Sequence, residues 1–310
     1  MTQLSSTNAQ GLSTNHSATT YTGRFAPSPS GALHFGSIVT AIASYLDARA
    51  NRGQWLVRME NLDPARETPE AAGEILRQLE AFGLHWDETV LYQSSRLDVY
   101  QQVMGFLDSK NLCFSCNCSR QQVKAMGSVY NGNCRNKTTA EEGPTAIRLK
   151  TESVVIAFED LIQGQINQQL EAQTGDFIIR RKDTLFAYQL AVVVDDAFQQ
   201  VTHVIRGYDL LDSTPRQIYL QAKLGYSTPH YGHVPVVVNE LGQKLSKQHF
   251  AVPVSKENSQ SMLFLGLKFL AQDPPAELQH APVSEQLDWA TAHWHIHTVP
   301  KLANIPQDST

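Results

Sequence analysis

Four cysteines lie close together in the sequence, and thiols at such spacing are common ligands of a metal ion. Cys113, Cys116, Cys118 and Cys134 fall within a stretch of 22 residues. They are too few and too clustered for a disulfide scaffold, so the spacing favours a metal site. Zinc in a structural site takes four tetrahedral ligands. Beside Cys116, Cys118 and Cys134, the fourth ligand is therefore either Cys113 or, with an unusual Cys-x-Cys-x11-Tyr-x3-Cys spacing, Tyr130.

A second group of residues has the types and order needed to handle phosphate. Residues 24–37 read RFAPSPSGALHFGS, a short apolar strand followed by a proline and glycine turn, with His34 and Gly36 at the opening of a helix. Glycine lets a phosphate or an adenine approach the backbone closely. The N-terminus of a helix offers unpaired N–H groups to anions, and His34 can donate a hydrogen bond to a phosphate. A proline-kinked connection with a capping histidine would give the same spacing.

Two lysines after the last predicted strand form a third candidate site, again for phosphate. Lys244 and Lys247 lie in the segment KLSKQ, just after an apolar strand and Gly242. In a loop, two lysines at this spacing can reach a polyphosphate and stabilise the negative charge that builds up during its reaction. A pair of solvated surface lysines is a much commoner explanation of such a segment taken alone.

These groups must be positioned by regular elements, and the first 110 residues alternate strands with helices. We expect strands at 22–26, 54–60 and 90–93, and helices at 38–49, 69–82 and 97–107. Apolar residues at spacings of three and four carry the helices, and short apolar runs carry the strands. Such alternation predicts an α/β fold with a parallel sheet. In these sheets ligands bind at the carboxyl ends of the strands.

The same reading divides the chain into segments. Residues 1–20 are rich in Ser, Thr and Asn and predict a disordered tail. Residues 21–110 and 176–250 predict the first and second halves of one α/β domain, and the second half ends in the KLSKQ loop. The intervening residues 111–175 predict an insertion that carries the metal site. Residues 251–310 predict a short helical region.

Composition and charge restrict the function further. Of 310 residues, 25 are Lys or Arg and 30 are Asp or Glu, which gives a formal net charge of −5. A protein that coats nucleic acid by bulk electrostatics would be basic, so any contact with nucleic acid requires a local patch. The longest apolar stretches are far shorter than the roughly 20 residues of a membrane span. We expect a cytoplasmic monomer with no membrane contact.

Taken together and in this order, the motifs resemble those of a known family. The segment at 24–37 resembles the HIGH signature of class I aminoacyl-tRNA synthetases, and KLSKQ resembles their KMSKS signature. The stretches GRFAPSPSGALHFGS, VRMENLDPAR, FGLHWDE and THVIRGYDLLDSTPRQIYL resemble the glutamyl-tRNA synthetase group. The second histidine of HIGH is Ser37 here, and the methionine and final serine of KMSKS are Leu245 and Gln248.

The resemblance implies a Rossmann-like class I synthetase catalytic domain with a zinc-bearing insertion. It assigns catalytic roles to His34, Lys244 and Lys247, and ATP binding to His34, Gly36, Ser37 and Lys247. The ATP would arrive with Mg²⁺. In such a reaction the carboxylate of the amino acid is already a nucleophile, so the protein supplies position and electrostatic stabilisation and no general base.

The resemblance also implies a glutamate pocket. Its residues would be Arg24, Phe25, Ala26, Pro27, Ser28, Glu60, Tyr188 and Arg206. The two arginines would bind the carboxylates and Glu60 the ammonium group, while Ser28 and Tyr188 would add hydrogen bonds. Arginine suits a carboxylate because its planar guanidinium binds both oxygens. Where the family usually has Arg-Ile-Glu-Asp, this chain has Arg-Met-Glu-Asn, with Asn61 at the last position.

For the metal, the resemblance favours a structural zinc held by Cys116, Cys118, Tyr130 and Cys134. Cys113 would then be a buried free thiol.

The length after the second signature indicates the RNA substrate. Only 63 residues follow Lys247, fewer than the anticodon-binding region of a bacterial glutamyl-tRNA synthetase requires. This arrangement resembles the truncated glutamyl-Q tRNA(Asp) synthetase family. That family activates glutamate with ATP in the absence of tRNA and transfers it to queuosine, in the anticodon stem-loop of tRNA(Asp). The alternatives are a minimal glutamyl-tRNA synthetase that charges a tRNA 3′ end and a non-catalytic, zinc-containing RNA-binding paralogue.

Overall fold

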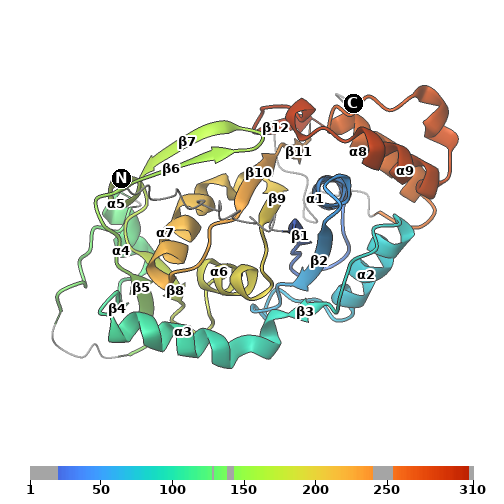
Figure 1. The fold of residues 1–310 in the computed structure, drawn as a ribbon. Coiled ribbons are helices and arrows are strands. Elements are labelled where there is room, and N and C mark those ends of the chain that lie inside the picture. The colour runs from blue at the N-terminus through green and yellow to red at the C-terminus, as the bar shows by residue number, and fades with distance from the viewer. Residues whose placement is uncertain (1–19, 128, 138–142, 240–253, 307–310) are drawn as a thin grey trace, which may run out of the picture.

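The first half of the chain forms one side of a parallel sheet. The computed structural model describes residues 20–127, 129–137, 143–239 and 254–306. Strands β1 (Thr22–Phe25), β2 (Gln54–Met59) and β3 (Leu91–Tyr92) pair in parallel in that order. Helices α1 (Phe35–Ala50) and α2 (Ala71–Ala81) connect them, and α3 (Leu97–Ser109) follows (Figure 1). The alternation predicted for residues 22–107 is confirmed.

Strands from later in the chain form a second sheet, whose edge strand lies beside β1. Strands β9 (His203–Gly207) and β10 (His230–Val234) pair in parallel, and α7 (Thr214–Leu224) connects them. β9 lies beside β1, where the Thr202 amide donates a hydrogen bond of 2.9 Å to the Thr22 carbonyl oxygen. The strand order therefore reverses between β1 and β9. Ligands of open α/β sheets bind at such a reversal, next to the carboxyl ends of the strands.

A hairpin from the middle of the chain completes this sheet. Strand β6 (Val155–Asp160) pairs with β10, and β7 (Gly164–Gln169) pairs antiparallel with β6. Both strands fall within residues 111–175, which the sequence analysis predicts as an insertion. The hairpin joins the catalytic sheet because Asp160, at the end of β6, accepts hydrogen bonds from the backbone N–H groups of Ile162 and His233.

A separate antiparallel sheet carries the cysteines. It consists of β4 (Cys113–Cys116), β5 (Ala146–Leu149) and β8 (Phe177–Arg180) in that order. Two short helices, α4 (Arg120–Ala125) and α5 (Leu170–Gln173), belong to the same part of the chain. β8 lies beyond the predicted end of the insertion, yet it pairs with β5. The next helix, α6 (Tyr188–Phe198), returns the chain to the catalytic sheet.

The C-terminal helices pack against the catalytic sheet. α8 (Ser259–Phe269) and α9 (Val283–His293) lie beside α1, as Figure 1 shows in orange and red. The last strand, β12 (Asn304–Pro306), pairs in parallel with β11 (Val236–Val238). Trp294 is buried there, and its indole N–H donates a hydrogen bond of 2.9 Å to Asp47 on α1.

Two apolar clusters hold these parts together. The first surrounds α1, whose Ile38, Ile42 and Leu46 are fully buried. The second lies between the cysteine-bearing sheet and α6, and it includes Leu149 and Val192. None of the described helices is both long enough and apolar enough to cross a membrane.

Candidate functional site

A cavity of about 280 Å³ opens at the strand reversal, between the carboxyl ends of β1, β9 and β10. Most of the residues predicted from the first signature line it. They are Phe25, Ala26, Pro27, Ser28, His34, Gly36 and Ser37. The opposite wall comes from residues after β9 and β10, including Gly207 and Val237. Lys244 and Lys247 fall outside the described residues, so their position relative to this cavity stays a prediction.

His34 is the N-cap of α1 and also faces the cavity. Its side chain accepts a hydrogen bond from the Ser37 amide at 3.4 Å, and Ser37 Oγ accepts one from the His34 amide at 2.8 Å. This reciprocal capping box fixes the start of the helix. Because Nδ1 is the acceptor, the neutral ring carries its proton on Nε2. One side chain can therefore serve both predicted roles: Nδ1 caps the helix, and the N–H at Nε2 can donate a hydrogen bond to a phosphate.

A buried network of charges lies behind the cavity. Arg24 Nε is 3.3 Å from Asp196 Oδ1, and Arg58 contacts the same oxygen at 2.8 Å. Arg58 also reaches Glu60 at 3.4 Å, and its side chain is fully buried. The two arginines are thus balanced by the two carboxylates of Asp196 and Glu60, and the protein itself neutralises this part of the site.

The two carboxyl groups of the network differ in their pKa values. Burial raises the pKa of Asp196, but the guanidinium groups of Arg24 and Arg58 outweigh burial, and the pKa lies below its ordinary value. Burial also raises the pKa of Glu60, and here Arg58 and Arg24 offset it only in part. The ionised form is therefore more strongly stabilised in Asp196 than in Glu60. A further cationic group beside Glu60 would stabilise its ionised form.

Arg206, at the end of β9, belongs to a second buried chain of hydrogen bonds. Its Nε donates to His233 Nε2 at 3.0 Å, and His233 Nδ1 is 2.5 Å from Asp160 Oδ2. Burial lowers the pKa of His233 to about 4, although the hydrogen bond to Asp160 opposes this. The imidazole is thus neutral at pH 7 and holds its proton toward Asp160. Its other nitrogen is left to accept from Arg206.

Every hydrogen-bond partner of Arg206 among the described residues is neutral. Besides His233, its guanidinium donates to Tyr188 Oη at 3.3 Å, Thr214 Oγ1 at 2.7 Å and a backbone carbonyl oxygen. The residue is only 3% exposed. Among the described residues, no carboxylate pairs with it. A buried charge without a counter-ion is costly, so this position favours a ligand that carries an anionic group.

The five polar residues predicted for the glutamate pocket lie close together in the structure. Burial raises the pKa of Tyr188, Arg206 and Arg24 lower it, and Glu60 raises it. The charges of Arg206, Arg24 and Glu60 therefore all lie close enough to the Tyr188 hydroxyl group to shift its pKa. Ser28 lines the cavity and also a small neighbouring hollow that Glu60 lines. Their assignment to glutamate stays a prediction.

Asn61, which replaces the family's usual aspartate, has a structural role. Its side-chain amide donates to Ser94 Oγ at 2.8 Å, and its carbonyl oxygen accepts from the Ser94 amide at 3.0 Å. The pair ties the loop after β2 to the short 3-10 helix after β3. A carboxylate could accept from the same hydroxyl and amide of Ser94, so the asparagine keeps this link and removes one negative charge.

Three residues of the site were not found from the sequence. Asp160, Asp196 and His233 are all buried and hold Arg24, Arg58 or Arg206 in place. Ionisable residues in very apolar surroundings could have revealed them, because buried charges are rare unless they are paired. Asp195 and Asp196 follow the run AVVV on α6, and His233 precedes VPVVV.

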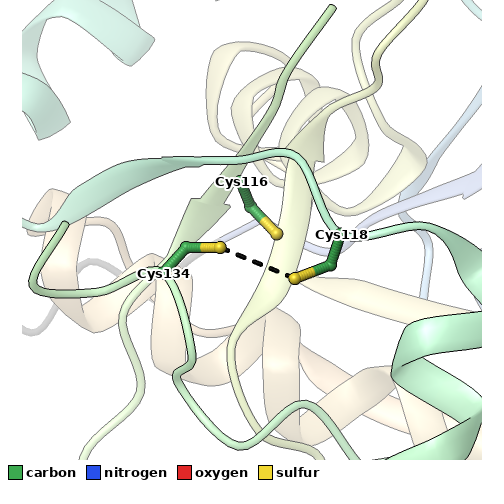
Figure 2. Close-up of side chains that lie close together, drawn as sticks. All are labelled: Cys116, Cys118 and Cys134. Atoms are coloured by element: carbon green, nitrogen blue, oxygen red, sulfur yellow. Dashed lines mark hydrogen bonds between the residues drawn. The ribbon is translucent and has the colours of Figure 1, made fainter. Parts of the chain in front are cut away.

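The cysteine cluster is a second, smaller site. The thiols of Cys116, Cys118 and Cys134 point toward one another (Figure 2), and their sulfur atoms all lie within 4.8 Å. Cys118 Sγ and Cys134 Sγ are 3.5 Å apart. Tyr130 Oη lies 3.5 Å from Cys116 Sγ and accepts a hydrogen bond of 2.8 Å from the Cys134 amide.

Cys113 lies apart from this group. Its thiol is directed toward Asp108 Oδ1 at 3.8 Å, and the residue packs in the larger apolar cluster near Leu149. Burial raises the pKa of Cys113 to about 11. Of the two candidates for a fourth ligand, Tyr130 is therefore the one whose donor atom lies with the three thiols.

The arrangement of the three sulfur atoms suits zinc. With Zn–S bonds of about 2.3 Å, a tetrahedral site places its sulfur atoms roughly 3.8 Å apart. The three thiols are already near that separation, and thiolates are preferred zinc ligands. Apolar contacts in this segment are few, because only the three thiols and Tyr130 are buried members of its cluster, and ion pairs of Arg135 with Asp176 and Glu171 supply further links. A bound metal would therefore stabilise the fold locally.

Comparison with known proteins defines the family. Residues 21–265 match the model of the catalytic domain of class I tRNA synthetases (E and Q). A glutamyl-Q tRNA(Asp) synthetase of Pseudomonas aeruginosa PAO1 is 49% identical over 93% of this chain and 98% of its own length. One of Pseudomonas putida KT2440 is 47% identical over 93% of the chain and 95% of its own length. The chain belongs to the glutamyl-Q tRNA(Asp) synthetase family.

Solved structures show the same fold at low sequence identity. A glutamate tRNA ligase from Elizabethkingia meningosepticum superposes with a TM-score of 0.76 at 23% identity. The match covers 92% of this chain and 66% of that ligase, so the chain spans about two thirds of its length. A glutamate-tRNA synthetase from Elizabethkingia anophelis gives a TM-score of 0.77, also at 23% identity.

Membership of this family makes the chain an enzyme. Its relatives are synthetases, and its catalytic domain is that of class I tRNA synthetases, so it is a ligase with a glutamyl-tRNA-synthetase-like function. ATP, glutamate and tRNA are the partners that this class implies. The predicted Rossmann-like fold class is confirmed.

Proposed function

We propose that this enzyme activates L-glutamate with ATP in the absence of tRNA and transfers it to queuosine at the wobble position of tRNA(Asp). The observation that carries the glutamate assignment is Arg206, a buried guanidinium whose described partners are all neutral. A ligand carboxylate would supply the missing counter-ion. The names of its relatives support queuosine and tRNA(Asp) as the second substrate.

Glutamate matches the charges around the 280 Å³ cavity and the buried arginines behind it, which together are called the catalytic crevice below. It brings two carboxylates and one ammonium group. One carboxylate would pair with Arg206 and the other with Arg24, while the ammonium group would pair with Glu60. Glutamine carries an amide in place of the side-chain carboxylate. With its amide beside Arg206, which has no carboxylate partner among the described residues, glutamine would leave that guanidinium without an anion, at a cost of roughly 3–5 kcal/mol, which is enough to reject it.

Activation would occur in the cavity at the start of α1. A carboxylate oxygen of glutamate attacks the α-phosphorus of ATP, the bond to the β-phosphate oxygen breaks, and pyrophosphate leaves. His34 and the N-terminus of α1 would bind phosphate oxygens, and Gly36 leaves room for them. A side chain at Gly36 would meet the His34 ring at 3.3 Å. Lys247 would stabilise the charge that develops on the phosphates, and Mg²⁺ would accompany the ATP.

Transfer would then release AMP. A hydroxyl group of queuosine attacks the carbonyl carbon of glutamyl adenylate and gives up its proton, while the carbonyl–phosphate bond breaks. The metal site would have no part in these steps. Cys116, Cys118, Tyr130 and Cys134 would hold a structural zinc, which leaves no ligand position for substrate.

Two assays test this proposal. ATP–pyrophosphate exchange with glutamate and without RNA should proceed, and labelled glutamate should appear only on tRNA(Asp) that contains queuosine. The label should survive removal of the 3′-terminal nucleotide.

The alternatives give different results. A minimal glutamyl-tRNA synthetase would lose the label together with that nucleotide. A non-catalytic RNA-binding paralogue would show no exchange under any condition. Either result would refute the proposal.

A further inference from the structure

A second cavity, of about 770 Å³, opens beside the cysteine cluster, and its lining is strongly basic. Its charged lining residues are Arg120, Lys124, Arg148, Arg181, Lys182 and a single acid, Asp183. Because the whole chain has a net charge of −5, this concentration of cations is local. We propose that this basic cavity binds the phosphate backbone of the RNA substrate.

The basic cavity has a rigid floor. Arg148 is 7% exposed, its guanidinium lies 4.0 Å from the centre of the Tyr130 ring, and it donates to the Asp176 carbonyl oxygen at 2.6 Å. Lys182 donates to the Asn117 carbonyl oxygen at 2.5 Å. Arg148 also hydrogen-bonds the Cys116 side chain, so it links the cavity to the cysteine cluster. Neither Arg148 nor Lys182 forms an ion pair with a carboxylate among the described residues.

The rim of the cavity carries its exposed cations. Arg120 and Lys124 are four residues apart on α4, so their side chains lie on one face of the helix. Both are exposed, and neither forms an ion pair with another described residue. Exposed cations of this kind are free to bind phosphates, and their binding releases the counter-ions that surround the nucleic acid.

One ion pair connects the basic cavity with the catalytic crevice. Arg181, which lines the cavity, pairs with Asp63 at 2.8 Å. Asp63 in turn lines the small hollow that contains Ser28 and Glu60. A polyanion whose reactive hydroxyl group lies in the crevice could therefore place neighbouring phosphates along the cavity. This argument rests on the proposed function, because it takes the second substrate to be an RNA.

The dimensions also favour an extended ligand over a free phosphate. A single phosphate ion would fill a small part of 770 Å³ and could contact only some of the cations. Val123 and Ile178 add apolar surface between the charged groups. Ribose and base faces can pack on such surface while the phosphates bind the cations.

The test compares two double variants. Arg120→Ala/Lys124→Ala removes the rim cations, and Lys268→Ala/Lys301→Ala removes two exposed lysines elsewhere as a matched control. Affinity for queuosine-containing and unmodified tRNA(Asp) is measured over a range of salt concentrations. We expect the rim variant to bind both RNAs about 10- to 100-fold more weakly, with a salt slope shallower by about 1–2. Exchange without RNA should be unchanged.

The outcomes separate this inference from the proposed function. Equal affinity and equal salt slope in the two double variants would overturn the basic cavity as an RNA site. A wild-type protein that binds RNA through the rim cations, yet transfers glutamate to neither RNA, would support the cavity and refute the queuosine assignment.

Discussion

The catalytic crevice and the cysteine cluster are both polar sites in a mostly apolar protein, but they are stabilised in different ways. In the crevice, Arg24 and Arg58 are neutralised by acids of the same chain, and a hydrogen-bonded histidine orients Arg206. The cysteine cluster has three converging thiols and few apolar neighbours. The crevice is therefore organised by side chains of the protein alone, whereas the three thiols of the cluster could hold a metal ion.

The difference implies a division of labour. The crevice contains the groups that would activate glutamate. The cluster supports the segment that forms the floor of the basic cavity, through Tyr130 and Asn117. Loss of metal should then affect RNA transfer more than activation. The predictions below test this division, beginning with the largest effect.

Arg206→Ala should lower kcat/KM for glutamate-dependent exchange by about 10²–10³-fold, because it removes the charge that would bind a substrate carboxylate. It should not lower the melting temperature by more than a few degrees, since a buried charge without a counter-ion is removed. Exchange kinetics and thermal unfolding measure the two effects. Wild-type exchange in a folded variant would show that Arg206 does not bind substrate.

Cys118→Ser and Cys134→Ser should each reduce bound zinc from one equivalent to nearly none, whereas Cys113→Ser should retain it. The reason is that only the first two thiols converge with Cys116. Metal analysis of the purified protein gives the result.

Tyr130→Phe sharpens this test. It removes the phenol oxygen near Cys116 and should weaken zinc binding at least 10-fold if that oxygen is a ligand. Full retention of zinc by Tyr130→Phe, together with its loss in Cys113→Ser, would reverse the choice of fourth ligand.

His233→Asn should raise KM for glutamate about 10-fold and leave KM for ATP nearly unchanged. His233 accepts a hydrogen bond from Arg206 and forms none with the described residues of the first signature, so it would position the guanidinium without contacting ATP. A purely structural residue would lower kcat and raise both KM values through partial unfolding. Equal changes in the two KM values would therefore contradict a positioning role.

Acid should destabilise the folded protein through the same histidine, and this is the smallest effect. The pKa of His233 is about 4 in the folded protein and about 6.5 in an unfolded chain. The unfolded state then binds more protons between these values, so the free energy of unfolding falls as pH decreases from about 6.5 to 4. Denaturant unfolding at pH 7 and pH 5 should show a smaller decrease in His233→Asn than in the wild type. An equal decrease would show that His233 does not contribute.

The sequence predicted the local parts of the site better than its long-range pairs. The strand, turn and helix around His34 follow from neighbouring residues, and they appear as predicted. Asp196 lies 172 residues from Arg24, and Asp160 lies 73 residues from His233. No periodicity joins positions so far apart. The convergence of Arg24, Glu60, Tyr188 and Arg206 was expected only from the family resemblance.

The boundaries of the insertion illustrate the same limit. The sequence predicted a change of pattern after residue 110, and the structure has a new sheet there. It gave no sign that β6 and β7 would pair with β10, because strand pairing depends on partners elsewhere in the chain. Likewise, Tyr130 can lie among the cysteines only because residue 175 is a glycine. A side chain at Gly175 would meet the Tyr130 carbonyl oxygen at 2.3 Å.

The most direct test of the division between the two regions is to remove the metal. The purified protein is treated with a chelator until zinc is absent, and ATP–pyrophosphate exchange is measured without RNA beside glutamate transfer to queuosine-containing tRNA(Asp). We predict that exchange keeps most of its rate, that transfer falls at least 10-fold, and that added zinc restores it. Loss of exchange in proportion to the metal would contradict an independently organised crevice.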